Sequence, residues 1–219
     1  MNPDISIIIP VIRETGTINQ AIEALSRQTF KGTAEVIVVD GDPDGSTLRQ
    51  IRTGPVTGLI SEPGRGIQLN AGAAKASGRI LLFLHCDTRL PESGLQAVHD
   101  LMSDAFLSAG AFDLKIDKTG LPFRIIEKTA SLRSRLTLIP YGDQAVFVRQ
   151  SFFDRIGGFS PIPIMEDVEL MRRVKQAGGR IGFVDRPVST SARRWEKEGL
   201  LRCTFRNWLM MTLYLFGVS

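Results

Sequence analysis

The chain has 219 residues, 43% of them hydrophobic and 23% charged, with a formal net charge of +4 and an isoelectric point near 9.3. This composition is typical of one globular domain that buries a substantial core. The basic residues form no long run, which favours a solvated surface over a nucleic-acid patch; an anionic substrate or lipid is also compatible.

Two cysteines without metal-site or disulfide spacing indicate a reducing compartment. The chain opens without the pattern of a signal peptide, and no run reaches the roughly 18 apolar residues of a membrane span. We therefore expect a cytoplasmic protein, possibly at the inner face of the membrane.

The first half alternates strand and helix patterns. Thr17 and Gln20 have the spacing of a capping box ahead of an apolar stripe through Leu25. Repeated units of this kind predict a parallel sheet with helices on both faces. The expected strands are residues 5–9, 36–39, 57–60 and 80–84, and the expected helices lie near residues 17–25, 47–51, 66–76 and 95–102.

The pattern changes after about residue 108. Strands are expected at residues 109–116 and 145–148, and helices at 121–136 and 167–177. No repeat, low-complexity segment or linker interrupts the chain. We expect one domain over residues 1–219, with a nucleotide-binding half (about 1–106), an acceptor or catalytic half (about 107–195) and a C-terminal helix (about 196–219).

Two apolar strands end in carboxylates, Asp40 and Asp87. In an open α/β sheet, ligands bind outside the carboxyl ends of the strands. Hard oxygen ligands around a divalent cation are typical of sites for phosphate-bearing substrates. The sequence therefore predicts a carboxylate-rich site at one edge of the sheet.

Five segments, in their order and spacing, resemble the family 2 glycosyltransferases of GT-A fold, a Rossmann-like, mostly parallel α/β sheet flanked by helices. The resemblance covers nearly the whole chain. The segments are Ile7-Ile8-Ile9-Pro10, Val38-Val39-Asp40-Gly41, Leu84-His85-Cys86-Asp87, Gly157-Gly158-Phe159 with Met165-Glu166-Asp167, and Ser191-Ala192-Arg193-Arg194-Trp195. The stretch from Gly64 to Ala73 is similar to a less-characterised branch, so the substrate does not carry over.

The resemblance implies a nucleotide-diphosphate sugar donor and a divalent metal, Mn²⁺ or Mg²⁺. Asp40 would bind the base or ribose beside Pro10; the alternative is a plain turn or N-cap aspartate. Asp87 would bind the metal. His85 stands where the family usually has a first aspartate, and could be a metal ligand, a nucleotide contact or a core histidine. Cys86 reads as a small buried hydrophobe rather than a nucleophile.

Arg65 lies at the start of a helix, where phosphate is attracted, and Gln68 and Asn70 could add polar contacts. An ordinary capped turn explains this segment equally well. Asp143 is the candidate for contacts with the acceptor or donor sugar. By resemblance, Arg194 would stabilise the leaving diphosphate and Trp195 would stack on a sugar or close a lid, although the glutamine that often precedes this pair is missing.

Asp167 would be the general base in an inverting single displacement, with Glu166 in support. The alternative for both is capping of the helix that they open, since acids favour the first turn.

The C-terminal segment has an apolar stripe with Arg202 and Arg206 beside it. It could pack on the domain, form a homodimer contact or rest on a membrane; the last would suit a lipid-linked acceptor. Two other functions stay open: a sugar-nucleotide nucleotidyltransferase and a non-catalytic nucleotide-binding or membrane-associated scaffold. A nucleic-acid binder is not expected.

Overall fold

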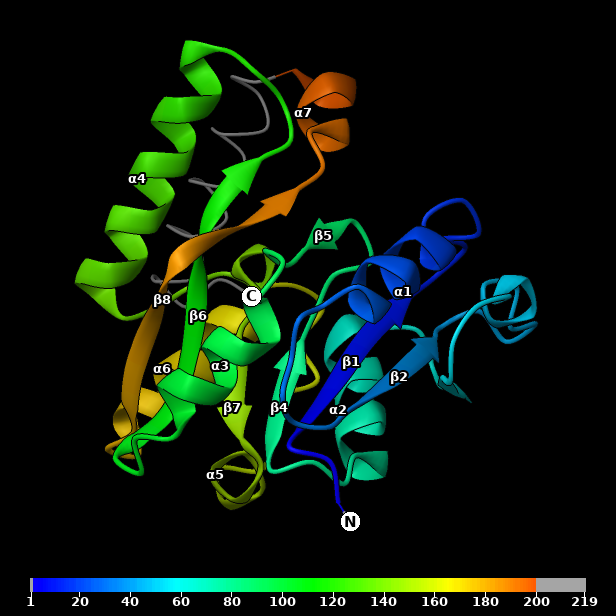
Figure 1. Cartoon of the computed structure of the whole chain (residues 1–219), viewed down its shortest axis with the longest axis horizontal. Helices are drawn as coiled ribbons and strands as arrows, with labels where there is room; N and C mark the ends of the chain where they lie inside the picture. Colours follow the sequence, from blue (N-terminus) through cyan, green and yellow to red (C-terminus); the bar gives the residue numbers. More distant parts are fainter. Residues whose placement is uncertain (1, 200–219) are drawn as a thin grey trace.

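The computed structural model describes residues 2–199, and one eight-stranded sheet runs through them in the order β3-β2-β1-β4-β7-β6-β8-β5 (Figure 1). Both expected halves of the chain contribute strands to this sheet. The C-terminal segment and its expected helix lie outside the described residues, apart from a short helix that ends at Glu198.

The first half of the chain supplies the four parallel strands. β1 is central and pairs with β2 on one side and β4 on the other. The bounds are Ile5–Val11 for β1, Ala34–Asp40 for β2, Thr57–Ile60 for β3 and Ile80–Phe83 for β4. Val11 lies opposite Asp40 in the register. The carboxyl ends of the parallel strands therefore lie at one edge of the sheet, as expected.

The rest of the sheet, which includes the short β5 of the first half, is mixed. β7 runs antiparallel to both β4 and β6, whereas β6 and β8 are parallel. The bounds are Thr88–Arg89 for β5, Leu107–Ile116 for β6, Phe147–Arg149 for β7 and Arg180–Thr190 for β8. The sheet is thus of the mostly parallel α/β kind that was expected.

Helices cover both faces, and alternate residues of β1 separate the two cores. Ile7 belongs to the core under α1 and α3, while Ile8 belongs to the core under α2 and α6. The helices are α1 (Ile18–Ser26), α2 (Arg65–Lys75), α3 (Gly94–Met102), α4 (Leu121–Thr137), α5 (Gln150–Arg155), α6 (Glu166–Gln176) and α7 (Arg193–Glu198), with 3-10 turns η1 (Leu48–Gln50) and η2 (Gly142–Gln144).

The capping box expected at Thr17 is wrong. The Thr17 hydroxyl makes no cap bond to α1; it lies 2.9 Å from Glu14 Oε2 and 3.2 Å from Cys86 Sγ. The physical reason is a competing local partner, because a threonine hydroxyl bonds the nearest available acceptor. Cys86 is buried, as expected for a small hydrophobe.

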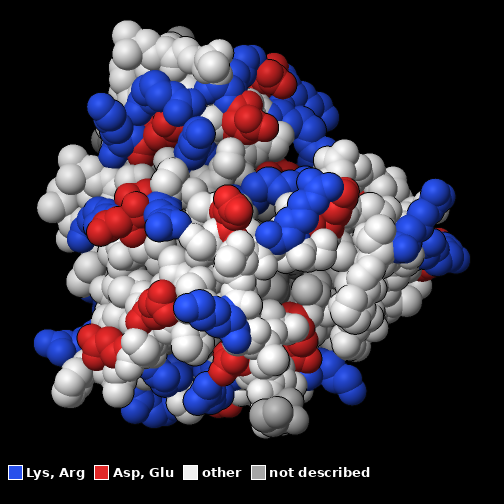
Figure 2. Space-filling view, viewed as in Figure 1, with Lys and Arg blue, Asp and Glu red and all other residues white. Residues whose placement is uncertain are grey.

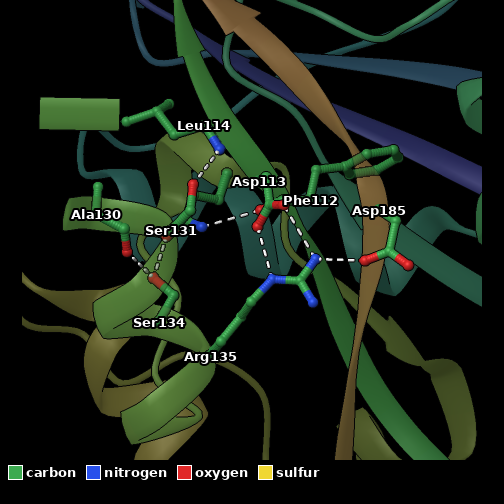
Figure 3. Close-up of polar contacts among 9 residues, drawn as sticks. Phe112, Asp113, Leu114, Ala130, Ser131, Ser134, Arg135 and Asp185 are labelled. Carbon is green, nitrogen blue, oxygen red and sulfur yellow. Dashed lines mark hydrogen bonds and ion pairs between the residues drawn. The ribbon is translucent and has the colours of Figure 1, made fainter. Parts of the chain in front are cut away.

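β6 extends beyond the short β7, and polar side chains of α4 and η2 bond its uncovered backbone (Figure 3). Leu114 N donates to Ser131 Oγ at 3.0 Å, and Ile116 N donates to Glu127 Oε1 at 2.6 Å. Gln144 Nε2 donates to Phe112 O at 2.9 Å. A strand edge that would otherwise leave unpaired backbone groups is therefore closed by side chains.

Candidate active site

The first turn of α6 and the segment after β4 converge beyond the carboxyl end of the parallel strands. A cavity of about 10 Å³, room for one water at most, lies between them. Four of the predicted site residues line it: Arg65, His85, Glu166 and Asp167. The structure thus brings together side chains that are up to 102 positions apart in the chain.

The Asp167 carboxylate is held by backbone amides. Oδ1 accepts from Val168 N at 2.8 Å, and Oδ2 accepts from the N–H of Gly142 in η2. A Cβ atom added to Gly142 would lie 2.9 Å from His85 Nε2 and 3.1 Å from Asp167 Oδ2. The imidazole and the carboxylate therefore both face the Gly142 backbone, and only a glycine leaves them this space.

Glu166 is almost fully buried and forms an ion pair with Arg65, whose Nη1 lies 3.0 Å from Glu166 Oε1. Burial raises the pKa of Glu166, and the adjacent Asp167 charge raises it further, against the opposing effect of Arg65. This ion pair ties the start of α2 to the start of α6, which fixes the Asp167 side of the cavity.

The Gly157-Gly158-Phe159 segment supports the same side of the cavity. The Asn70 amide bonds both backbone groups of Phe159, with Nδ2 donating to O and Oδ1 accepting from N, each at 2.8 Å. The Phe159 ring packs edge-on against Phe83 at 4.8 Å between centroids. Gly158 has φ of +69°, in the region that favours glycine.

Three residues that the sequence analysis assigned to donor contacts have internal partners. The buried Asp40 carboxylate accepts from the backbone N–H groups of Asp42, Thr47 and Leu48, so it shapes the turn after β2. Gln68 Nε2 donates to Val11 O and Val39 O, which joins the ends of β1 and β2. Asn70 hydrogen-bonds both backbone groups of Phe159, as described above. Their contact with a donor stays a prediction.

The turn that carries Asp87 lies beside the segment that carries Arg194 and Trp195. Ser191 N donates to Asp87 O at 3.2 Å. Trp195 is half-buried in α7, and the Arg194 side chain lies outside the described part. Pro10 is half-buried near the end of β1, opposite Val39. Asp87, Trp195 and Pro10 do not line the cavity, although the turn and α7 adjoin each other.

Within residues 2–199, no three His, Cys, Asp or Glu side chains are grouped so that they could hold a metal ion. Asp87 and His85 could together supply at most two protein ligands. Mg²⁺ is commonly held by one or two protein ligands together with substrate phosphates. The residues therefore fit a cation that arrives with a diphosphate, and not a metal bound by the protein alone.

Arg133 is a site residue that the sequence analysis missed. Its guanidinium carbon lies 3.3 Å from the centroid of the Tyr141 ring, and its Nη2 donates to Ser134 Oγ at 3.0 Å. Burial lowers the pKa of Arg133, and the charges of Asp143 and Asp167 oppose that shift. A partly buried cation thus stands in the field of the two carboxylates of η2 and α6. No sequence signal distinguishes it from the other basic residues of α4.

Comparison with known proteins is consistent with this architecture. Residues 6–163 match the family described as glycosyl transferase family 2. None of the curated proteins matches the chain in sequence. Among solved structures, similar folds are seen in S. aureus TarS residues 1–349 (TM-score 0.67, 18% identity, 88% of this chain and 61% of that one) and in a mannosyltransferase from Pyrobaculum calidifontis in complex with GDP-Man and Mn²⁺ (TM-score 0.67, 20% identity, 87% and 57%).

The TarS fragment in complex with UDP-GlcNAc is also similar, with a TM-score of 0.65 and 19% identity over 87% of this chain and 58% of that one. The chain thus spans about 60% of the length of the chains in these three structures. At these identities the structures establish the GT-A fold, while the sequence match establishes the family. The chain belongs to glycosyl transferase family 2, whose members are enzymes of the glycosyltransferase type.

Proposed function

We propose that the chain transfers a sugar from a nucleotide-diphosphate donor to an acceptor hydroxyl, with inversion by single displacement. The observation that carries the proposal is the placement of the Asp167 carboxylate. It opens α6, is held by two backbone amides, and shares one cavity with Arg65, His85 and Glu166. A fixed carboxylate at a pocket edge is what a general base requires.

In this mechanism the acceptor oxygen attacks the anomeric carbon on the face opposite the diphosphate. Its proton passes to the Asp167 carboxylate as the bond between the anomeric carbon and the diphosphate breaks. The amide of Gly142 holds the Asp167 carboxylate in place before the reaction. Glu166 positions the first turn of α6 through its ion pair with Arg65.

The donor would lie across the ends of β1, β2 and β4. The N-terminus of α2 attracts the diphosphate, with Arg65 beside it. Pro10 and the turn held by Asp40 would form the wall of the base pocket. Asp143 would contact a sugar, and Arg194 and Trp195, on the other side of the Asp87 turn, would close over the leaving group.

A divalent cation would be held by Asp87, with His85 as a possible second ligand, and by the donor diphosphate. When bound, it neutralises charge that develops on the leaving diphosphate. The Mn²⁺ in the mannosyltransferase complex supports this proposal by fold similarity. His85 also faces the Asp167 carboxylate across Gly142, so a role in orienting the base competes with metal binding for this side chain.

The alternatives receive less support. A nucleotidyltransferase would need a glycine- and basic-rich loop after the first strand, and the chain has Ile12-Arg13-Glu14 there. Family membership also favours sugar transfer. A non-catalytic scaffold would not need a carboxylate held at the cavity together with Arg65 and Glu166.

The test is calorimetric titration of UDP and GDP, each with and without Mn²⁺, on the wild type and on Asp167→Asn. Metal-dependent binding of one diphosphate supports the donor site and identifies the nucleotide for turnover assays. Asp167→Asn should keep that binding and lose transfer by about 10²-fold or more. Absence of binding for both diphosphates, or full turnover by Asp167→Asn, would refute the proposal.

A further inference from the structure

α4 has inverted polarity for a helix that packs on a sheet. Its buried residues are Glu127 and Ser134, and Ser131 also faces β6 (Figure 3). At the exposed end of the same contact, Arg135 binds both oxygens of Asp113 at 3.0 Å and reaches Asp185 at 2.7 Å. Polar side chains thus hold α4 on β6 and β8 beside the half-buried Phe123 and Ile126, and four large apolar side chains of the helix are exposed.

The outward side carries a continuous apolar stripe. Four large side chains are spaced by 4, 7 and 4 residues, which places them on one helix face. We call them the α4 stripe: Leu121, Ile125, Leu132 and Leu136, which are 74%, 53%, 59% and 75% exposed. At 1.5 Å per residue the stripe is about 22 Å long. Scattered apolar residues are ordinary on a surface, but an aligned row marks an interaction site.

The same helix is basic in sequence, but most of its cations are paired. It contains Arg124, Lys128, Arg133 and Arg135 against Glu127, a net charge of +3. Arg124 pairs with Glu127, and Arg135 pairs with Asp113 and Asp185. Lys128 is exposed and lies within the α4 stripe, between Ile125 and Leu132. Figure 2 shows Lys and Arg over α4 and α7 with Asp and Glu among them, beside uncharged surface. The charge within the α4 stripe itself is that of Lys128, so a complementary partner is apolar and carries negative charge beside this lysine.

The C-terminal segment of this chain is the competing occupant, because α7 adjoins the start of α4 through the ion pair of Lys118 Nζ with Glu196 Oε1 at 2.6 Å. Residues 200–219 contain Arg202 and Arg206 and no acidic residue. Packed on α4, they would bring further positive charge beside Lys128. Their sequence complements the same anionic, apolar partner as α4 does.

We infer that α4 is a docking surface for anionic lipid, lying in the membrane interface with the α4 stripe inserted among the acyl chains. An amphipathic helix with a basic border binds in this way through buried apolar area together with attraction to anionic headgroups. None of the helices in residues 2–199 is long and apolar enough to cross a membrane. The inference is independent of the proposed reaction, because it concerns only the outer face of α4.

The experiment is co-sedimentation of the full chain with vesicles of phosphatidylglycerol and phosphatidylcholine, and with vesicles of phosphatidylcholine alone. The variant is Leu132→Gln with Leu136→Gln. The matched control is Phe106→Gln, which removes a large side chain that is 72% exposed outside α4. We expect binding to the anionic vesicles only, weakened about tenfold or more in the double variant and unchanged in the control.

Added salt should weaken the binding, because surface charges are screened. The thermal midpoint of the double variant should stay near that of the wild type, since both substituted residues are exposed. Wild-type chain that stays in the supernatant would overturn the inference, as would full binding by the double variant, which would assign binding to residues 200–219. A dimer that the double variant abolishes, without vesicle binding, would assign the α4 stripe to self-association.

Discussion

Gly142→Ala is the sharpest test of the site geometry, because it adds one methyl group between two of the proposed functional side chains. The new Cβ would lie 2.9 Å from His85 Nε2 and 3.1 Å from Asp167 Oδ2. Non-bonded heavy atoms pack best at about 3.5 Å or more, so each side chain must withdraw by about half an ångström. The backbone of Gly142 is not in the left-handed region, so alanine itself introduces no strain there.

A displacement of this size at a general base should lower kcat/KM by roughly ten- to hundredfold. The atoms that must move end flexible side chains, so the free energy of unfolding should fall by only about 1 kcal/mol, or about 2–4 °C in Tm. Nucleotide binding measured without Mn²⁺ should change little, because the added atom displaces only Asp167 and His85, whose proposed roles are base and metal ligand. The measurements are turnover with UDP-GlcNAc and GDP-mannose, calorimetric binding of UDP and GDP, and thermal unfolding.

The matched control is Gly16→Ala, where the added methyl meets nothing within 4 Å and φ lies outside the left-handed region. It should retain both stability and turnover. If Gly142→Ala keeps wild-type kcat/KM, the Asp167 carboxylate is not the base in this position. If it loses nucleotide binding together with its fold, the assumption that the two side chains yield locally is wrong.

Three further predictions follow from named contacts. Because the pKa of Glu166 is raised, the folded state holds the proton of this residue more tightly than the unfolded state does. Glu166 therefore favours folding at low pH, and this contribution is lost as pH rises above 4.5. Glu166→Gln should remove this pH-dependent contribution from a plot of unfolding free energy against pH, and an unchanged plot would contradict the prediction. Burial raises the pKa of Cys86 to about 11, so roughly one thiol in a thousand is ionised in the native protein at pH 8. In a Cys203→Ser background, iodoacetamide at this pH should therefore leave the native protein unlabelled and should label the protein in urea. Asn70→Ala should lower the free energy of unfolding in urea by about 2 kcal/mol or more, because two backbone groups of the buried Phe159 lose their partners. The control Asn19→Ala releases two exposed backbone groups and should lower it by less than about 1 kcal/mol. Equal losses of stability in the two variants would refute the burial argument.

The parallel half of the sheet could be predicted because β1, β2 and β4 are apolar runs of strand length. The position of Asp40 at a strand end followed from this pattern, and that of Asp167 followed from the apolar stripe of the helix that it opens. What could not be predicted was which polar groups find partners inside the protein. The Asp40 carboxylate bonds amides up to eight residues away, and Asn70 bonds Phe159, 89 residues away. Such pairings depend on tertiary contacts that no local pattern encodes.

α4 is the part of the fold where local pattern was least informative, and it is also where the two proposals meet. A helix is ordinarily assumed to turn its apolar residues inward, but β6 offers α4 unpaired backbone groups, so Glu127 and Ser131 face the sheet. That inversion places Arg133 near Asp143 and Asp167 and leaves the α4 stripe outside. If α4 docks on anionic lipid as inferred, the face that holds Arg133 near the proposed base is fixed relative to the membrane. An acceptor whose hydroxyl or phosphate lies at the lipid surface would then reach Asp167 more readily than one in free solution, and comparing the kcat/KM of one acceptor in vesicles and in detergent would measure that advantage.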